Sequence, residues 1–179
     1  MTTPLSTILL GGARSGKSEL AVRMAQAWGG PVTLIATAEA FDDDMTARIA
    51  RHRLDRPAEW AVVEEPIDLG YALHNAPEDH LVLVDCLTVW VGTLMFREYR
   101  EDDIQARVAT ILTVIARRTT PTIFVSNEVG LGVHPETDMG RNYRDVLGRV
   151  NQRVVAGTDR AFFLVAGRAL PLLDGADLW

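Results

Sequence analysis

The segment from Gly11 to Ser18 constrains this chain more than any other feature. It reads Gly-Gly-Ala-Arg-Ser-Gly-Lys-Ser and stands between an apolar run at 7–10 and a helix-forming stretch at 19–28. In this pattern glycines let backbone N–H groups surround phosphate oxygens, the lysine adds positive charge, and the serine hydroxyl can bind magnesium. A plain strand-to-helix turn would need neither the lysine nor the serine. The sequence therefore predicts a nucleotide phosphate site formed by Gly11, Gly12, Ala13, Arg14, Ser15, Gly16, Lys17 and Ser18, with Ser18 as a metal ligand.

Composition and charge restrict the class of protein. The chain has 179 residues, of which 47% are apolar and 23% charged, and its net charge is −6. We expect one well-packed domain over residues 1–179 and no broad nucleic-acid surface. The single cysteine, Cys86, excludes an internal disulfide and a cysteine-built metal site. No run is long enough to span a membrane and the N-terminus lacks a signal-peptide pattern, so we expect a soluble, cytoplasmic protein.

Five short apolar runs, at 8–10, 32–36, 81–84, 122–126 and 161–166, are nearly continuous rather than alternating. Such runs are typical of strands that are covered on both faces. Helical patterns lie between them, and two of these have clear apolar stripes, over 104–115 and 139–154. Together with the phosphate loop, this alternation predicts an α/β fold of the P-loop NTPase type, with three layers around a mostly parallel sheet. Ligands of such sheets bind beyond the carboxyl ends of the strands.

One carboxylate stands at such a strand end. Residues 81–84 are apolar and lead directly into Asp85. In proteins with a phosphate loop, an acid at this place holds magnesium opposite the serine of the loop, so we predict Asp85 as a second metal ligand. The alternative is an aspartate that only caps a turn. We expect Cys86, the next residue, to be a packed core thiol rather than a nucleophile.

The segment 41–57 carries an unusual group of charges. Aspartates at 42–44 suit a helix N-terminus, and His52 falls on the apolar face of that helix, with arginines at 48, 51, 53 and 56 around it. In one interpretation His52 is a packed core residue and the arginines are solvated. In the other, the arginines bind polyphosphate and disfavour the protonated imidazole, which leaves His52 able to attack phosphorus. The residues alone leave both interpretations open.

Several motifs together resemble one family. They are Gly11–Ser18, Ile35–Ala38, Asp42–Met45, Arg48–Ile49, His52–Arg53, Arg56–Pro57, Val84–Thr88, Ser126–Gly132 with Val133 and Pro135, and Gly148–Gln152. With this combination, which spans Leu9 to about Gly167, the chain resembles the bifunctional adenosylcobinamide kinase / adenosylcobinamide-phosphate guanylyltransferases of cobalamin biosynthesis. The combination is far more specific than the phosphate loop alone.

The resemblance implies two reactions and a set of residues for them. A nucleoside triphosphate, GTP or ATP, phosphorylates the aminopropanol hydroxyl of adenosylcobinamide, and GTP then donates GMP to that phosphate through a guanylyl-histidine. The resemblance implies His52 as the carrier of GMP, Lys17 as a catalytic residue, Mg²⁺ as the metal and a homotrimer as the assembly. The further nucleotide contacts that it implies are Ala36, Thr37, Ala38, Arg53, Leu54, Asp55, Arg56, Glu64 and Asp85.

Two other functions stay open at this point. One is a different small-molecule P-loop kinase with a structural His52, and the other is a non-catalytic GTP-binding switch, which the lack of an Asn-Lys-x-Asp run disfavours. Glu128 could orient a magnesium-bound water or the acceptor hydroxyl, or it could order its own loop. The loop that contains Gly130, Gly132 and Pro135 could contact the corrinoid. We expect His74 and His80 at the surface.

Overall fold

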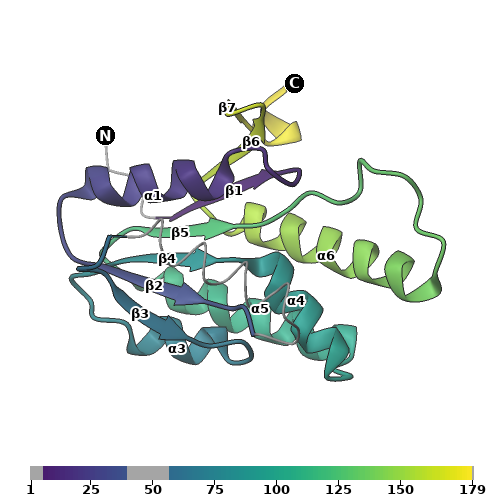
Figure 1. Cartoon of the computed structure of the whole chain (residues 1–179), viewed down its shortest axis with the longest axis horizontal. Coiled ribbons are helices and arrows are strands. Elements are labelled where there is room, and N and C mark those ends of the chain that lie inside the picture. Colours follow the sequence, from purple (N-terminus) through teal and green to yellow (C-terminus); the bar gives the residue numbers. More distant parts are fainter. Residues whose placement is uncertain (1–5, 40–56, 179) are drawn as a thin grey trace.

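A computed structural model of the chain describes residues 6–39 and 57–178, which contain a seven-stranded sheet (Figure 1). The strand order is β3-β2-β4-β5-β1-β6-β7, and every pairing is parallel except that of β6 with β7. The strands are β1 (Ser6–Gly11), β2 (Val32–Ala36), β3 (Ala61–Glu64), β4 (Leu81–Asp85), β5 (Thr122–Val125), β6 (Arg160–Val165) and β7 (Arg168–Pro171).

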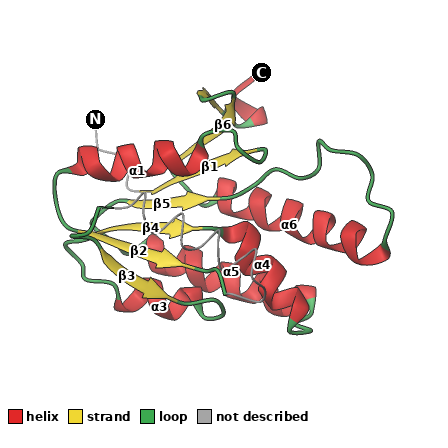
Figure 2. Ribbon diagram, in the orientation of Figure 1, coloured by secondary structure: helices red, strands yellow, loops and turns green. Residues whose placement is uncertain are grey.

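Helices cover both faces of the sheet, which confirms the expected layered α/β fold (Figure 2). The helices are α1 (Lys17–Trp28), α3 (Leu69–Asn75), α4 (Leu87–Phe96), α5 (Glu101–Ile115) and α6 (Asp138–Ala156), with a short 3-10 helix η1 (Gly175–Leu178). On one face Ala21 and Ala25 of α1 pack against strand residues such as Leu34 and Leu83. On the other face the remaining α-helices pack against residues such as Phe124. None of the helices in the described part of the chain is long and apolar enough to cross a membrane.

The five predicted strands and both striped helices are present, and the differences concern the two edge strands and the start of α6. The sequence pattern does not predict β3 or β7, the two edge strands. Each has a neighbour on one side only and exposes all of its residues, so neither needs a continuous apolar run. Met139 is a second difference, because it lies on the predicted stripe of α6 but is 77% exposed. The first turn of α6, where Met139 lies, extends beyond the sheet (Figure 1).

One arginine joins the loop before β4 to the loop before β5. The guanidinium group of Arg118 donates to Thr120 Oγ1 at 3.0 Å. It also donates, over 2.7–3.4 Å, to the carbonyl oxygens of Leu73, Ala76, Pro77 and His80. Burial lowers the pKa of Arg118. These bonds give the carbonyl groups at the end of α3 and in the following turn a charged donor.

We expect Arg118→Met to lower the free energy of unfolding by about 2 kcal/mol, because several partly buried carbonyl oxygens lose a charged donor. Urea denaturation measures this change. Arg117→Met is the matched control, since Arg117 is the exposed neighbour of Arg118. An equal loss in the two variants would show that the carbonyl contacts contribute nothing specific.

Candidate active site

Parallel pairing brings predicted site residues from three separate segments into one row at the carboxyl edge of the sheet. Ala36, the last residue of β2, lies opposite Glu64 of β3 on one side and Asp85 of β4 on the other. Asp85 in turn lies opposite Val125, the last residue of β5. The phosphate loop leaves β1 at Gly11, at this same edge. The sheet therefore makes neighbours of residues that are remote in sequence.

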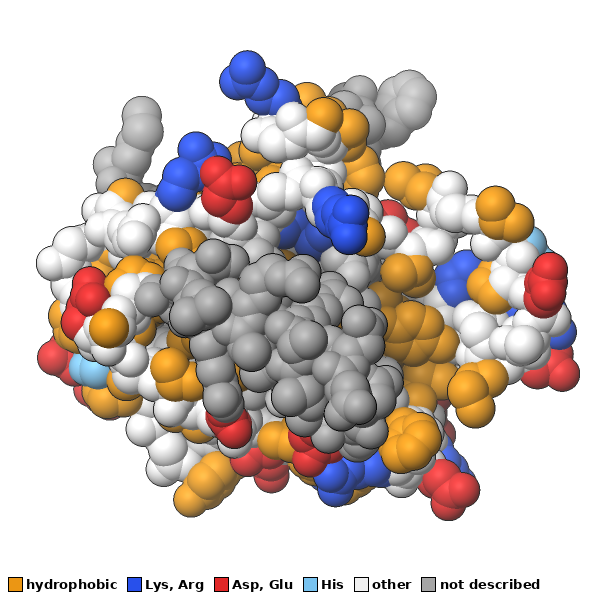
Figure 3. All heavy atoms as spheres, in the orientation of Figure 1, with side chains coloured by type: hydrophobic (Ala, Val, Ile, Leu, Met, Phe, Trp, Pro, Cys, Tyr) orange, Lys and Arg blue, Asp and Glu red, His pale blue; other side chains and the backbone are white. Residues whose placement is uncertain are grey.

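The phosphate loop joins β1 to α1 at the predicted place. Gly16, which has a φ of 98°, precedes Lys17, the first residue of α1. Lys17 is only 6% exposed, and its Nζ donates to Gly12 O at 2.7 Å. On the face shown in Figure 3, Lys and Arg side chains gather near the place where Figure 1 shows the turn from β1 to α1. A buried ammonium group beside the N-terminus of a helix is suited to binding an anion.

Both neighbours of β1 hold Gly11 in place. A side-chain carbon at Gly11 would lie 2.4 Å from Leu164 O of β6, and Gly11 has a φ of 150°. On the other side, Glu128 N donates to Gly11 O at 3.1 Å. The turn between β6 and β7 contacts the phosphate loop itself, because Gly167 N donates to Ser15 O at 3.0 Å. Only glycine permits so close a contact between β1 and β6.

Thr37 holds the end of β4 against the end of β2. Its buried hydroxyl donates to Cys86 O at 2.7 Å and accepts from Cys86 N at 2.9 Å. Its backbone N–H donates to Asp85 O at 3.2 Å. The main chain that carries Asp85 is therefore fixed by three bonds to one residue, while Ala36 and Ala38 lie half-buried on either side of Thr37.

Cys86 behaves as a packed thiol. Its side chain is partly buried against the apolar residues on the α1 side of the sheet. Burial, with a smaller contribution from the charge of Asp85, raises the pKa of the Cys86 thiol to about 11. Because the thiolate is the nucleophilic form, this group stays protonated at neutral pH and is poorly suited to attack.

The two predicted magnesium ligands, Ser18 and Asp85, both lie half-buried at the carboxyl edge. Mg²⁺ prefers oxygen ligands and usually takes one or two carboxylates together with water and substrate phosphates. Within residues 6–39 and 57–178, no three His, Cys, Asp or Glu side chains form a group that could hold a metal. A hydroxyl and a carboxylate beside a phosphate loop therefore suit a magnesium ion that is bound together with nucleotide phosphates.

Two of the side chains that the sequence raised as candidates have structural contacts. Glu128 Oε1 accepts from Gly130 N at 2.5 Å, which supports a role in ordering its own loop. His74 is exposed, as expected. The expectation that His80 is a surface group is wrong: the residue is half-buried, and its Nδ1 lies 2.8 Å from Thr33 Oγ1. The sequence pattern did not predict this contact because His80, in the turn before β4, meets Thr33 of β2, which is remote in the sequence.

The sequence pattern does not reveal a polar cluster beside the ends of β4 and β5. We call it the β5 polar cluster, and it consists of Thr88, Ser126, Asn127, Tyr143 and Asn151. Burial raises the pKa of Tyr143, so that its hydroxyl stays protonated and can donate. Four of its five residues lie in the motifs that carry the family resemblance, and one of them, Asn151, is an asparagine at a core position of α6, but the sequence alone does not show that they meet.

The proposed histidine and its neighbours fall outside the residues that the structure describes. They are His52, Arg53, Leu54, Asp55 and Arg56, and their roles stay predictions. Glu39, the last residue before that gap, accepts two hydrogen bonds from Arg97 Nη2, at 2.7 and 2.8 Å. This ion pair ties the chain to the end of α4 at the point where it enters the segment that contains His52.

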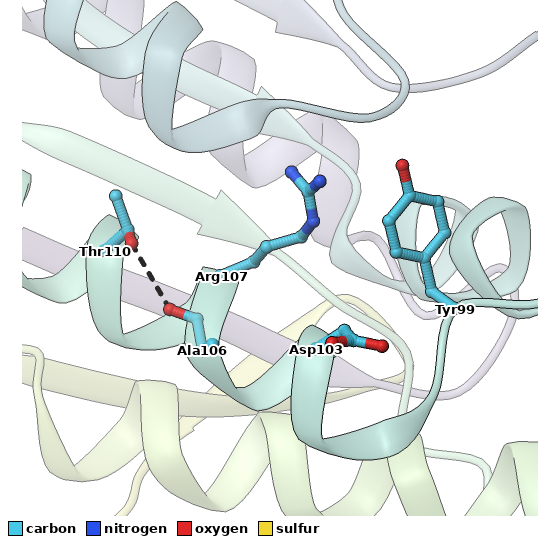
Figure 4. Close-up of a pocket in the computed structure, with 5 residues that line it drawn as sticks. All are labelled: Tyr99, Asp103, Ala106, Arg107 and Thr110. Atoms are coloured by element: carbon cyan, nitrogen blue, oxygen red, sulfur yellow. Dashed lines mark hydrogen bonds between the residues drawn. The ribbon is translucent and has the colours of Figure 1, made fainter.

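An open pocket on α5 contains none of the predicted site residues (Figure 4). Its lining consists of Tyr99, Asp103, Ala106, Arg107 and Thr110. The Arg107 guanidinium lies 4.9 Å from the centre of the Tyr99 ring and 3.9 Å from the carboxylate of Asp68. Because the charge of Arg107 already interacts with these groups, the carboxyl edge is the better candidate for a nucleotide site.

The sequence matches a family model described as cobinamide kinase / cobinamide phosphate guanyltransferase over residues 7–172. The bifunctional adenosylcobalamin biosynthesis protein CobP of Pseudomonas aeruginosa is 41% identical over 166 residues, which cover 92% of this chain and 95% of that protein. The bifunctional CobU proteins of Escherichia coli and Salmonella typhimurium are 35% and 36% identical, and each alignment covers 89% of this chain and 95% of the relative. The range of the family model includes the phosphate loop, Asp85 and His52.

Solved structures support the P-loop NTPase type of fold. The RadB recombinase superposes with a TM-score of 0.51 at 16% identity, covering 89% of this chain and 74% of that chain. A protein of Pyrococcus horikoshii OT3 superposes with a TM-score of 0.58 at 8% identity, covering 93% and 85%. At such low identity the likeness shows the fold alone.

We expect Gly11→Ala to lower the free energy of unfolding by more than about 2 kcal/mol, because the new carbon would be forced against Leu164 O at an unfavourable φ. Gly12→Ala is the control, since a carbon at Gly12 would meet nothing within 4 Å. For that variant we expect a change of no more than about 0.5 kcal/mol. Chemical denaturation measures both, and similar values would contradict the tight contact between β1 and β6.

Proposed function

The chain belongs to the cobinamide kinase / cobinamide phosphate guanyltransferase family, and we propose from this premise that it carries out both reactions in cobalamin biosynthesis. The observation that carries the proposal is the carboxyl edge, where Lys17 is held inside a phosphate loop and Asp85 stands two strands away. Relatives at 35–41% identity, whose names describe bifunctional proteins of adenosylcobalamin biosynthesis, support it. We further propose that a single domain holds both activities.

In the first step, the γ-phosphate of a nucleoside triphosphate passes to the aminopropanol hydroxyl of adenosylcobinamide. The hydroxyl oxygen bonds to phosphorus while the bond from phosphorus to the β-phosphate oxygen breaks, and the hydroxyl proton leaves to water. Backbone N–H groups of residues 11–16 and the Lys17 ammonium group stabilise the charge on the transferred group. Ser18 and Asp85 would hold Mg²⁺, which neutralises phosphate charge when it is bound.

In the second step, we assign the covalent chemistry to His52. An imidazole nitrogen attacks the α-phosphorus of GTP, a P–N bond forms, and pyrophosphate leaves with the electrons of the broken P–O bond. A phosphate oxygen of adenosylcobinamide phosphate then attacks the same phosphorus and breaks the P–N bond, which restores the histidine. Arginines at 48, 51, 53 and 56 offset the charge of the α-phosphate, and Ala36, Ala38 and Glu64 are proposed to contact the nucleotide.

Labelled GTP tests the covalent step directly. The protein is incubated with magnesium and GTP labelled at the α-phosphate or, separately, at the γ-phosphate, and bound label is measured after denaturation. We expect bound label from the α-position only, lost in acid and stable in base, because a phosphoramidate bond joins it to the imidazole. His52→Ala should abolish it, and His74→Ala, which alters an exposed histidine on α3, should retain it.

Absence of α-label on a protein that binds Mg·GTP would overturn the histidine step and favour a kinase in which His52 is structural. Transfer of γ-label to adenosylcobinamide reports the kinase step in the same samples. Parallel reactions with ATP and GTP show which nucleotide that step prefers.

We also propose a homotrimer, as the family resemblance implies. Exposed apolar side chains on and after the β6–β7 hairpin could supply part of an interface, and they are Val165, Leu170, Leu172 and Leu173. Light scattering on the purified protein should give the mass of three copies of the 19.7 kDa chain. A single monomer peak across the working concentration range would exclude the trimer.

A further inference from the structure

The β5 polar cluster contains a buried amide that packing does not require. Asn151 is 4% exposed and lies among the valines and leucines that α6 packs onto the sheet. Both ends of its amide group are used, because Ser126 Oγ donates to Asn151 Oδ1 at 2.7 Å and Asn151 Nδ2 donates to Asn127 O at 3.0 Å. A leucine would occupy similar space without the cost of burying polar atoms. The amide therefore calls for an explanation other than stability.

The bonds of Asn151 lead to the phosphate loop. Ser126 N donates to Leu9 O at 3.0 Å, and Glu128 N donates to Gly11 O at 3.1 Å. The two residues that Asn151 contacts, 126 and 127, stand directly before Glu128. The side-chain amide of Asn151 thus helps to position the backbone that binds Gly11, the first residue of the phosphate loop.

A second side chain, that of Thr88, binds the backbone of the same residue, Asn127. Thr88 Oγ1 accepts from Asn127 N at 2.6 Å, so that Thr88 and Asn151 satisfy the N–H and the C=O of one residue. Thr88 is fixed in turn by Tyr143, whose hydroxyl donates to Thr88 O at 3.0 Å. Thr88 lies three residues after Asp85, so the cluster connects the ends of β4 and β5.

We propose that Asn151 is a positioning residue that fixes the end of β5 and so keeps the phosphate loop and Asp85 in register for nucleotide binding and phosphoryl transfer. It does not touch the nucleotide and acts through Ser126 and Asn127. The part of this inference that concerns turnover rests on the proposed function, whereas the part that concerns nucleotide affinity requires only the phosphate loop.

Replacement of the amide by an apolar group gives the first test. In the folded enzyme we expect Asn151→Leu to raise the dissociation constant of Mg·GTP about fivefold or more, and to lower the turnover of adenosylcobinamide phosphorylation about tenfold or more, because small displacements at a catalytic edge are costly. Gln152→Leu is the matched control, since Gln152 is the exposed next residue of α6. The dissociation constant of Mg·GTP and the turnover of Gln152→Leu should stay within about twofold of those of the wild type.

A carboxyl group at the same place separates positioning from packing. When ionised, the new group of Asn151→Asp repels Asn127 O, but when protonated it can donate to Asn127 O and accept from Ser126 Oγ as the amide does. Its Mg·GTP affinity, divided by that of the wild type at the same pH, should recover as pH falls from about 8 to about 5.5. Asn151→Leu should show no recovery. The titratable groups of the adjoining segments, Asp85, Cys86, Glu128 and Tyr143, are the same in both proteins, so the ratio removes their effect.

Thermal denaturation of each variant separates a loss of folding from a loss of function. A lower midpoint in Asn151→Leu with wild-type affinity and turnover would overturn the inference, because Asn151 would then serve stability alone. If Asn151→Leu does not fold, Asn151→Asp provides the test: recovery of its relative Mg·GTP affinity at low pH supports the inference, and no recovery overturns it. If the wild type binds Mg·GTP but does not phosphorylate adenosylcobinamide, the proposed function fails, and the affinities alone decide the role of Asn151.

Discussion

The close contact between β1 and β6 at Gly11 is the constraint on which the carboxyl edge depends. Because no side chain separates these backbones, the chain can turn sharply after β1 and enclose the ammonium group of Lys17. A buried ammonium group is costly unless it is hydrogen-bonded, and Gly12 O accepts from it at 2.7 Å. The positive charge is therefore in place before an anion arrives, which reduces the reorganisation that binding and transfer require.

The ends of β4 and β5 are held mainly by side chains that hydrogen-bond to backbone atoms there. Thr37 fixes the end of β4, and the β5 polar cluster fixes the end of β5. Apart from Thr37, none of the residues that make these bonds is among those predicted to contact the nucleotide. The hydroxyl of Thr37 is bonded to Cys86 and its N–H to Asp85 O, so a polar nucleotide contact at this residue would involve its carbonyl oxygen.

Local patterns in the sequence were enough to predict the central strands, α5, α6 and the phosphate loop, because each is encoded by a few adjacent residues. They did not predict β3 and β7, since exposed edge strands need no apolar run. The contact of His80 with Thr33 and the contacts of Asn151 with Ser126 depend on which elements become neighbours. A single sequence does not contain that strand order as a local pattern. Asp85 was predicted at a strand end from the residues themselves, whereas Ala36 and Glu64 were expected as nucleotide contacts only through the resemblance to a family; that the three lie in one row follows from the strand order.

The carboxyl edge accounts for phosphoryl transfer more fully than for a covalent nucleotidyl step, which also needs a nucleophile. Cys86 is the thiol beside Asp85, and its raised pKa keeps it protonated at neutral pH. Among the described histidines, His80 contacts Thr33, His134 contacts Arg144 at 2.8 Å, and His74 is exposed on α3. None of these three lies in the row at the carboxyl edge. The fold, shared with proteins at 8–16% identity, identifies no nucleophile either. This agrees with our proposal that His52 carries the nucleotide, since four arginines near it in the sequence would supply the positive charge that a polyphosphate requires.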